Sequence, residues 1–497
     1  MEQLARRWMT PEPGAPCGAC ARGLVRALCI AAAALLVACG PDAPDSAAQR
    51  TGTGQPAGRL DADATDEVAA FVGVTVVPMD REQLLADQTV LVSEGLIRGI
   101  GPSAQVAVPP GATRIDGRGK FLMPGLAEMH AHIPGSGDRG YAENVLFLYV
   151  ANGVTTIRGM AGDPLHLELR EKTANGELMG PTIHAAAPGI SGDNAATPAD
   201  AERAVREHLK DGYDLLKVFE MPADSYRQMA RTAHELDIPF AGHVPEAVGL
   251  VGALDAGQAS IDHLDRYIEF LAPGWQDMPG RQAGFFGSGL VDLADTSRIP
   301  EAVERTLAAG TWNVPTLSLV EHLASPEHPE QMIQRPEMLY MPKEVLDRWV
   351  QAKKDYAARP DFRPEAATRL VEIRRQLVKA LHDAGAPIAL GSDAPQFFNV
   401  PGFSVHYEMA MMVAAGLTPY EVLVTGTRNP AAYFGMPEAF GTVQPGRRAD
   451  LVLLEANPLQ DVANVQRRAG VMVRGHWLPE PLIQERLSAI ATGVATE

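Results

Sequence analysis

The feature that most constrains the fold is an alternation of short β segments and helical stretches through the middle of the chain. Segments rich in apolar and β-branched residues recur there, and helix-forming stretches rich in Ala and Leu follow nearly all of them. The eight strand candidates are Gly125–His132, Thr155–Arg158, Thr182–Ala186, Leu215–Phe219, Pro239–His243, Ser260–His263, Asn313–Leu319 and Pro387–Asp393. Such alternation, repeated over roughly 310 residues, predicts an α/β fold, a (β/α)8 or TIM barrel spanning residues 124–438.

Two β-rich stretches flank this region. Alternating apolar residues broken by Gly, Pro and Asp mark antiparallel strands in FVGVTVVPMD and QTVLVSEGLIRGIG before it, and in LVLLEANPL and AGVMVRGHWL after it. We expect residues 67–123 and 439–482 to pair into one small β-sandwich domain.

A long insertion separates the sixth and eighth strand candidates. It contains the segment APGWQDMPGRQAGFFGSG, which is rich in Gly, Pro and aromatic residues. Loops of this length are usually functional or disordered. Because the insertion follows a strand, it should emerge at the face of the barrel that carries the active site.

The N-terminus has the pattern of a targeting segment. Arg22 and Arg26 precede the apolar run Ala27–Ala38, which is shorter than the ~20 residues that span a bilayer but suits a signal peptide. The run ends in LVACG, which resembles the lipobox of bacterial lipoproteins, with Cys39 as the lipidated residue. The alternative is a plain signal peptide with an incidental cysteine.

The predicted signal peptide, residues 1–39, is followed by a linker of different composition. Residues 40–66 are rich in Gly, Pro, Ala, Asp and Ser and are predicted to be a flexible linker. A lipid-anchored enzyme needs such a tether. We therefore expect a protein anchored in the membrane of the cell envelope, either facing the periplasm or in the outer membrane.

Charge and cysteine content exclude two classes of protein. The formal net charge is −18. A chain this acidic is a poor nucleic-acid binder, because that affinity depends on neutralising phosphates. All four cysteines precede residue 40, so the folded part contains no disulfide framework.

Residues that can bind metal stand at the ends of five strand candidates. They are His130, His132, Lys217, His243, His263 and Asp393. In the HxH pair, residues i and i+2 of a strand point to the same face. Each of the other residues alone is more often a core or capping residue. Together they indicate a site, because catalytic residues of such barrels come from several strand ends on one face.

This pattern resembles the binuclear amidohydrolase superfamily, in particular its imidazolonepropionase-like and prolidase-like members. The match consists of HxH after the first strand, Lys after the fourth, His after the fifth and sixth, and Asp after the eighth. The β-rich flanks and the ending GTVQPGRRADLVLLEANPL also look like that family. The resemblance covers residues 68–478.

The resemblance implies a role for each ligand. His130, His132 and Asp393 would bind the buried metal ion, whereas His243 and His263 would bind the more exposed one. Lys217, N-carboxylated by CO2, would bridge the two ions. These two divalent ions, expected to be zinc, would share a hydroxide and polarise the scissile carbonyl. Asp393 would act as the catalytic proton shuttle to the leaving amine.

The substrate is less constrained. Arg158 ends the second strand candidate, so its guanidinium would either clamp a substrate carboxylate or form an internal ion pair, and both readings stay open. A structural role is favoured for His184. His322 and Tyr340 belong to the insertion and are candidate pocket residues only.

Three functions remain under comparison. The first is hydrolysis of an amide bond, in a dipeptide or an N-acyl amino acid. The second uses the same metals to cleave an ester, a lactone or a cyclic amide. The third is a catalytically dead, surface-anchored binding protein, against which the complete ligand set weighs. The expected partners are a small-molecule or dipeptide substrate, the membrane through the lipid anchor and, as an open option, further copies of this chain.

Overall fold

The computed structural model describes residues 68–359 and 362–496. The predicted signal peptide, Cys39 and the predicted linker lie outside these residues. Within them, no helix combines the length and the apolar character that crossing a membrane requires.

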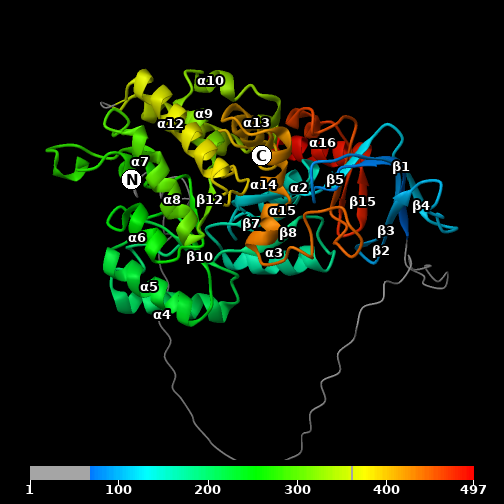
Figure 1. Cartoon of the computed structure of the whole chain (residues 1–497), viewed down its shortest axis with the longest axis horizontal. Coiled ribbons are helices and arrows are strands. Elements are labelled where there is room, and N and C mark those ends of the chain that lie inside the picture. Colours follow the sequence, from blue (N-terminus) through cyan, green and yellow to red (C-terminus); the bar gives the residue numbers. More distant parts are fainter. Residues whose placement is uncertain (1–67, 360–361, 497) are drawn as a thin grey trace, which may run out of the picture. The chain divides into compact units, whose positions relative to one another are not determined.

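The two flanking stretches meet in one connected eight-stranded sheet (Figure 1). Its strand order is β15-β14-β13-β5-β1-β2-β3, and β4 pairs with β1. The strands are β1 (Ala69–Val76), β2 (Leu85–Ser93), β3 (Leu96–Pro102), β4 (Thr113–Asp116), β5 (Phe121–Pro124), β13 (Leu451–Leu454), β14 (Arg468–Val473) and β15 (His476–Pro479). The flanks therefore pair as predicted, although the strands form one connected sheet instead of the two separate sheets of a sandwich.

The junction between the flanks is the antiparallel pair β5 and β13, in which Leu122 lies opposite Leu453. Phe71 and Val90 from the N-terminal side share a buried cluster with Leu451 and Met472 from the C-terminal side. Because burial of apolar surface is the main favourable term in folding, this shared core explains why neither flank forms a sheet of its own.

The middle of the chain forms two parallel sheets. The first has the order β6-β7-β8 and the second the order β12-β11-β10-β9. Their strands are β6 (Leu126–Ala131), β7 (Val154–Gly159), β8 (Thr182–Ala185), β9 (Leu216–Val218), β10 (Phe240–Gly242), β11 (Ser260–Asp262) and β12 (Trp312–Val314). Seven of the eight strand candidates thus contain a strand.

Isolated β-bridges connect these sheets end to end. Ala186 pairs with Leu215 between β8 and β9, Asn313 pairs with Ile388 beyond β12, and Ala394 pairs with Ala131 of β6, all in the parallel sense. The α/β part is therefore TIM-barrel-like, with a β-rich flank attached.

Two strand predictions were wrong in detail. The segment Pro387–Asp393 is no regular strand: it forms an isolated bridge at Ile388 and single backbone hydrogen bonds, such as that from the N–H of Met129 to the carbonyl of Leu390, and φ of Asp393 is 63°. The candidate Asn313–Leu319 is a strand only to Val314, since helix α9 begins at Leu317. The carboxylate of Glu408 accepts the backbone N–H groups of Leu317 and Ser318, which stabilises the start of that helix.

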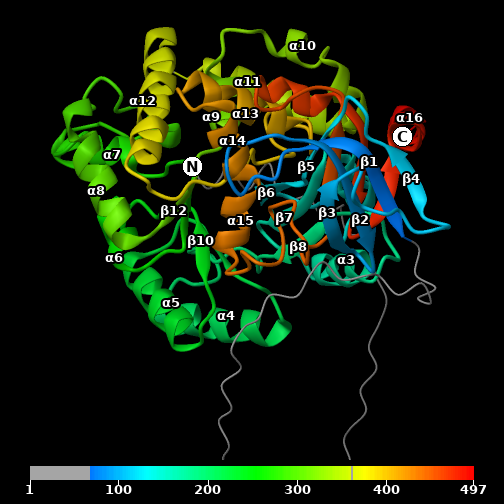
Figure 2. The ribbon, with the colours of Figure 1, turned by 45° about the vertical axis from the view of Figure 1, so that its right-hand side comes forward.

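Helices cover the outer side of the strands. Those between consecutive strands are α2 (Arg139–Ala151), α3 (Pro164–Ala174), α4 (Pro198–Asp211), α5 (Ala223–Glu235), α6 (Gly249–Asp255), α7 (Tyr267–Leu271) and α8 (Ile299–Ala309). Figures 1 and 2 show α4, α5, α6, α8 and α12 in a row along one side of the molecule. Helix α4 begins with a proline in its first turn, its C-cap is Gly212, which has left-handed backbone, and Thr197 forms a capping box.

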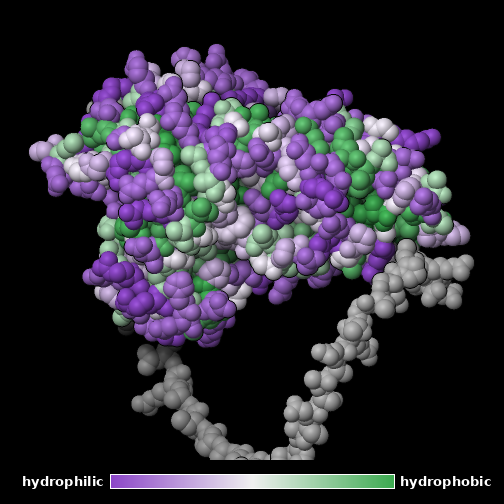
Figure 3. All heavy atoms as spheres, viewed as in Figure 1, coloured by the Kyte–Doolittle hydropathy of each residue, from purple (hydrophilic) through white to green (hydrophobic). Residues whose placement is uncertain are grey.

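The predicted insertion is mainly helical. It contributes α9 (Leu317–Ala324), α10 (Pro329–Met332), α11 (Lys343–Ala357) and α12 (Pro364–Asp383), and α13 (Ser404–Ala414), α14 (Pro419–Gly426) and α15 (Arg428–Tyr433) follow. A last helix, α16 (Glu480–Thr496), begins before the predicted end of the flank at residue 482. The face in Figure 3 is mostly hydrophilic, with hydrophobic side chains in scattered groups.

Candidate metal centre

The structure brings all six predicted ligands together. One ligand atom each of His130, His132 and Asp393 lies within 4.8 Å of the others. Nε2 of His132 is 2.7 Å from Oδ1 of Asp393, and Nε2 of His130 is 3.6 Å from the same atom. These three side chains come from the end of β6 and from the segment that bridges back to it.

Lys217 and the two remaining histidines complete the group. Nζ of Lys217 is 3.3 Å from Nε2 of His130. The ring of His263 lies between two others, with its centroid 4.5 Å from that of His130 and 4.7 Å from that of His243. Nδ1 of His263 is 3.8 Å from Oδ2 of Asp393, so the two halves of the predicted ligand set are continuous.

The glycine before His243 makes room for the lysine. Gly242 has a φ of 112°, and a Cβ at this position would lie 2.7 Å from Cδ and 3.1 Å from Nζ of Lys217. Any other residue would therefore collide with the lysine and strain the backbone. The end of β10 is shaped so that the side chain from the neighbouring β9 reaches the centre.

Two of the ligands lie in strained backbone. Asp393 and His263 have φ values of 63° and 62°, in the left-handed region that non-glycine residues rarely occupy. Hydrogen bonds hold both positions: Gln396 donates to Oδ1 of Asp393 at 2.9 Å, and Arg374 of α12 donates to the carbonyl of His263 at 2.6 Å. Strain of this kind persists only where surrounding structure determines it, and it is typical of functional sites.

A buried carboxylate locks the strand segments on which the ligands lie. Glu128 of β6 accepts the backbone N–H of Ser392 at 2.7 Å and that of His130 at 3.1 Å, and the Ser392 hydroxyl at 2.7 Å. Burial raises the pKa of Glu128 to about 8. Glu128 thereby ties the residue before Asp393 to the backbone of His130.

Burial sets the electrostatics of the centre. It lowers the pKa of His130 and that of His263 well below their ordinary range, and neighbouring basic groups add to the effect. Burial also lowers the pKa of Lys217. His130 and His263 are therefore neutral imidazoles, the form that binds metal.

A divalent cation fits this set of donors. Nε2 of His263 is buried and has no hydrogen-bond partner among the described residues. Buried polar atoms are normally satisfied, so an unpaired imidazole nitrogen beside a carboxylate indicates a missing partner. Imidazole nitrogen and carboxylate oxygen are common ligands of divalent metal ions, zinc among them.

Arg158 does not clamp a substrate. It is fully buried, and its guanidinium donates to both carboxylate oxygens of Asp262, at 3.0 and 2.9 Å. Its other N–H groups donate to Met129, Ser260 and Tyr433. The open alternative of an internal ion pair is therefore correct, and the substrate-binding prediction for Arg158 was wrong, because no donor is left for a ligand.

The other candidate pocket residues, His184, His322 and Tyr340, contact side chains that are not predicted ligands. His184 stacks on Phe434 with ring centroids 3.6 Å apart, which agrees with the structural role favoured for it. His322 accepts a hydrogen bond from Arg335 at 3.0 Å, and Tyr340 stacks on Phe403. No described contact joins His322 or Tyr340 to a predicted ligand.

Aromatic rings from the insertion and from the segment after Asp393 lie against the centre. The ring of Phe286 is 5.3 Å from that of His263, and Phe285 is 4.2 Å from Phe286 and 6.1 Å from Phe397. All three phenylalanines are half-buried. These three rings form a partly open phenylalanine wall beside the metal ligands, and the guanidinium carbon of Arg374 lies 5.7 Å from the centroid of the Phe286 ring.

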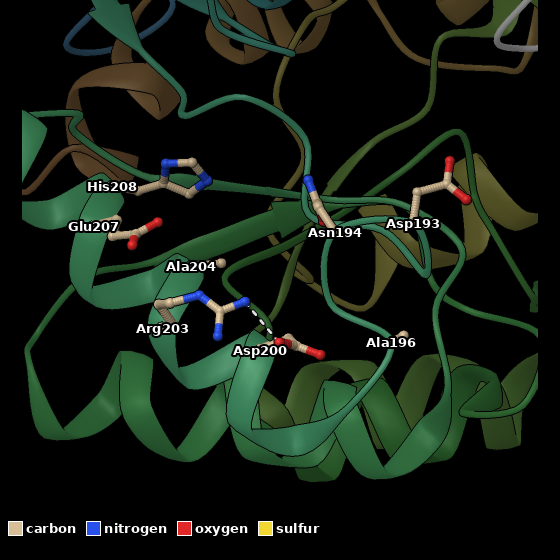
Figure 4. A pocket seen from close by; sticks show the side chains of 8 residues that line it. All are labelled: Asp193, Asn194, Ala196, Asp200, Arg203, Ala204, Glu207 and His208. Carbon is tan, nitrogen blue, oxygen red and sulfur yellow. Dashed lines mark hydrogen bonds and ion pairs between the residues drawn. The ribbon is translucent and has the colours of Figure 1, made fainter. Parts of the chain in front are cut away.

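A separate hollow of about 470 Å³ lies over α4 (Figure 4). It is lined by charged and polar side chains such as Glu207 and His208, and Arg203 and Asp200 pair within it. None of the lining residues is a predicted ligand. This hollow is therefore distinct from the metal centre.

Several relatives share this architecture. An imidazolonepropionase of Pseudomonas syringae pv. tomato is 26% identical over 411 residues, covering 80% of this chain and 91% of the relative. The structure of a bottromycin amidohydrolase superposes with a TM-score of 0.65 at 22% identity, covering 87% of this chain and 92% of that one. The structure of a Xaa-Pro dipeptidase with bound methionine in its active site superposes with a TM-score of 0.61 at 19% identity, covering 83% of this chain and 100% of that one. The two structures share the fold.

The model of the amidohydrolase family matches residues 121–478. The match covers most of the chain, so the protein belongs to the amidohydrolase family. It is accordingly a metal-dependent hydrolase acting on carbon–nitrogen bonds.

Sequence reasoning missed the residues behind the ligands. Nδ1 of His243 is 2.9 Å from Oδ2 of Asp265, and Nδ1 of His263 is 2.8 Å from Oγ1 of Thr316. Asp262 and Asp265 lie one and two residues from His263 in the sequence. The segment SIDHLD thus carried a signal, since acidic residues beside a ligand histidine commonly orient ligands.

Proposed function

We propose that this protein hydrolyses the amide bond of a dipeptide or an N-acyl amino acid, using two divalent metal ions, zinc by preference. The observation that carries the proposal is the convergence of six ligand-capable side chains from β6, β9, β10, β11 and the segment 387–394. In this proposal the segment is the eighth strand of a closed (β/α)8 barrel. The parallel bridges of Ile388 and Ala394 support that interpretation.

The ligands divide as the family resemblance implies. His130, His132 and Asp393 would hold the first ion, and His243 and His263 would hold the second. Lys217 would be N-carboxylated and bridge them; its complete burial, with Nζ 3.3 Å from Nε2 of His130, supports this role, since a carboxylate facing two cations is better accommodated there than an ammonium. When bound, the ions polarise the scissile carbonyl and activate a water molecule.

Asp393 moves the proton. Its carboxylate accepts a hydrogen bond from Gln396, and its oxygens lie 2.7 Å from Nε2 of His132 and 3.8 Å from Nδ1 of His263. In this proposal the attacking water lies beside that carboxylate. Asp393 accepts the proton of that water and returns it to the leaving nitrogen, so that the amine departs neutral.

The phenylalanine wall supports a substrate with an apolar group near the scissile bond. Phe285, Phe286 and Phe397 offer apolar ring surface beside His263. Burying an apolar side chain against such rings contributes about 1.5–3 kcal/mol.

Metal analysis of the purified protein, followed by a substrate panel, tests the proposal. The panel contains dipeptides and N-acyl amino acids with apolar or charged side chains, together with esters, lactones and cyclic amides. We expect close to two metal ions per chain and the highest kcat/KM for apolar amides. Preference for lactones or cyclic amides would select the second function, and metal-loaded protein inactive on every substrate would support the binding protein.

Substitution of the wall gives an independent control. Phe286→Ala should lower kcat/KM for apolar amides more than for charged ones. Phe270→Ala is the matched variant, because Phe270 is also half-buried in the insertion but stacks on Arg298 instead of a ligand. Equal losses of kcat/KM in both variants, on apolar and on charged amides alike, would show that the phenylalanine wall does not contact the substrate.

We also propose that Cys39 is lipidated and anchors the enzyme in the cell envelope, facing the periplasm or in the outer membrane. The LVACG motif and the linker composition support this. Cys39→Ser should convert a membrane-associated protein into a soluble or unprocessed one. Wild-type protein found wholly in the soluble fraction, with a free N-terminus, would contradict the anchor.

A further inference from the structure

We propose that Arg158 is a positioning residue that, together with Asp262, sets the spacing of His130 and His263 beneath the metal centre. The inference rests on the proposed function only in that these histidines hold metal.

The contacts of Arg158 cross the interior of the α/β part. From β7, its Nε donates to the carbonyl of Met129 on β6 at 2.6 Å. Its Nη1 donates to Oγ of Ser260 on β11 and to the hydroxyl of Tyr433, both at 2.8 Å. Its Nη2 donates to the carboxylate of Asp262. These contacts use all five N–H donors of the guanidinium.

Two of these contacts lie next to ligands. Met129 precedes His130 and Asp262 precedes His263. In addition, Oδ2 of Asp262 lies 2.7 Å from Nδ1 of His130. The guanidinium of Arg158 therefore restrains the backbone beside His130 directly. Through Asp262 it also restrains the ring of His130 and the end of β11, where His263 follows.

Stability alone does not account for this arrangement. Replacing a buried ion pair by apolar residues often leaves the stability of the fold unchanged or raises it, whereas removing one partner leaves a buried charge unpaired. The planar, five-donor geometry of arginine is what joins three strands here, and the compact ammonium of lysine does not reproduce it. The arrangement is suited to fixing distances between groups on different strands.

The deciding variant removes both charges at once. In Arg158→Met/Asp262→Leu no buried charge is left unpaired, so we expect a folded protein by circular dichroism and thermal melting. Its affinity for Zn²⁺ should nevertheless fall by about 10–100-fold, the usual effect of removing a residue that orients a ligand. Affinity is measured by competition between the metal-free protein and a chromogenic chelator, so no turnover is needed.

Arg448→Met/Asp450→Leu is the matched control. This arginine–aspartate pair also contacts a barrel strand, through Thr156, but touches no predicted ligand. It should retain the Zn²⁺ affinity of the wild type. Arg158→Lys keeps the charge and serves if the double variant does not fold; it should also bind Zn²⁺ more weakly.

The outcomes separate the two proposals. Wild-type Zn²⁺ affinity in the folded Arg158 variants would overturn the positioning role and leave the proposed function intact. A wild-type protein that binds no Zn²⁺ would overturn the proposed function and this inference with it.

Discussion

The imidazoles of the metal centre are held from behind by oxygen atoms of other side chains. The Nδ1 atoms of His130, His243 and His263 lie 2.7, 2.9 and 2.8 Å from oxygens of Asp262, Asp265 and Thr316. Such contacts fix the orientation of a ring before a metal arrives. At this scale the site depends on single atoms, so single substitutions should separate metal binding from catalysis.

Lys217→Ala should lose activity and most of the bound metal, because Lys217 is fully buried with its Nζ 3.3 Å from Nε2 of His130. Metal analysis and turnover on an apolar dipeptide measure the two losses. Lys217→Glu should retain part of the metal, since it restores a carboxylate at shorter reach. Lys353→Ala is the control: Lys353 is also a buried lysine, but it donates to carbonyls at the end of α9. Full activity of Lys217→Ala would exclude the bridging role.

Asp393→Asn should keep much of the metal but lower kcat by ~10²–10⁴-fold, the usual cost of removing a general base. The amide oxygen can still coordinate, whereas the amide cannot accept the proton. Parallel measurement of metal content and kcat over a range of pH distinguishes the two functions of this side chain. Turnover that is unchanged at every pH would rule out Asp393 as the proton shuttle.

Helices determine where the strand ends lie. Arg374 of α12 donates to the carbonyls of His263 and Pro315, at 2.6 and 2.7 Å, and Glu408 of α13 accepts two N–H groups at the start of α9. Burial lowers the pKa of Arg374 to about 10. The end of β11 and the turn after β12 are thus held from outside the sheet, which supports the strained backbone at His263.

Helix α13 also carries a buried histidine that should make the fold sensitive to acid. Burial, reinforced by Arg468, lowers the pKa of His406 from 6.5 to about 3. Between these values the unfolded chain binds a proton that the folded chain does not. The free energy of unfolding should therefore fall as pH is lowered, by about 1.4 kcal/mol per unit for this residue.

His406→Asn should reduce the slope of the free energy of unfolding against pH by the equivalent of one bound proton. Chemical denaturation at a series of pH values between 3 and 7 measures it. His476→Asn is the control, because His476 is exposed. A slope equal to that of the wild type would show that His406 is protonated in the folded protein.

Pairing between distant parts of the chain joins the two halves of the flank and the two ends of the α/β part. β5 pairs with β13 although more than half of the sequence separates them, and the segment 387–394 bridges back to β6. The metal ligands therefore come from both ends of the α/β part. Metal bound there should stabilise the entire unit, because it connects segments that unfolding would separate.

Removal of metal by a chelator should consequently lower the melting temperature, and added Zn²⁺ should restore it. A ligand present at a hundred times its Kd stabilises the folded state by about 2.7 kcal/mol. Thermal melts of the metal-free and reloaded protein measure the shift, which should be much smaller in Lys217→Ala. Identical melting of the metal-free and the loaded wild type would argue against a metal that joins these strands.

The sequence by itself determined the positions of most strands and the identity of the residues that meet at their ends. Short apolar runs and the alternation in HAH report which side of a strand is buried, and this is a local property. Seven strand candidates therefore contain strands, and the six ligand candidates converge. The family also follows from these motifs, because their order along the chain is specific.

Only the tertiary structure decided which distant groups meet. Position at the end of a strand indicates where Arg158 points, but its partner Asp262 lies 104 residues away. The choice between a substrate and an internal carboxylate depends on that partner. Likewise, the segment Pro387–Asp393 has the composition of a strand, yet it meets its neighbours only through an isolated bridge and single backbone hydrogen bonds, and its backbone enters the left-handed region at Asp393. Periodicity reports local burial, whereas pairing between remote residues depends on how all the elements pack together.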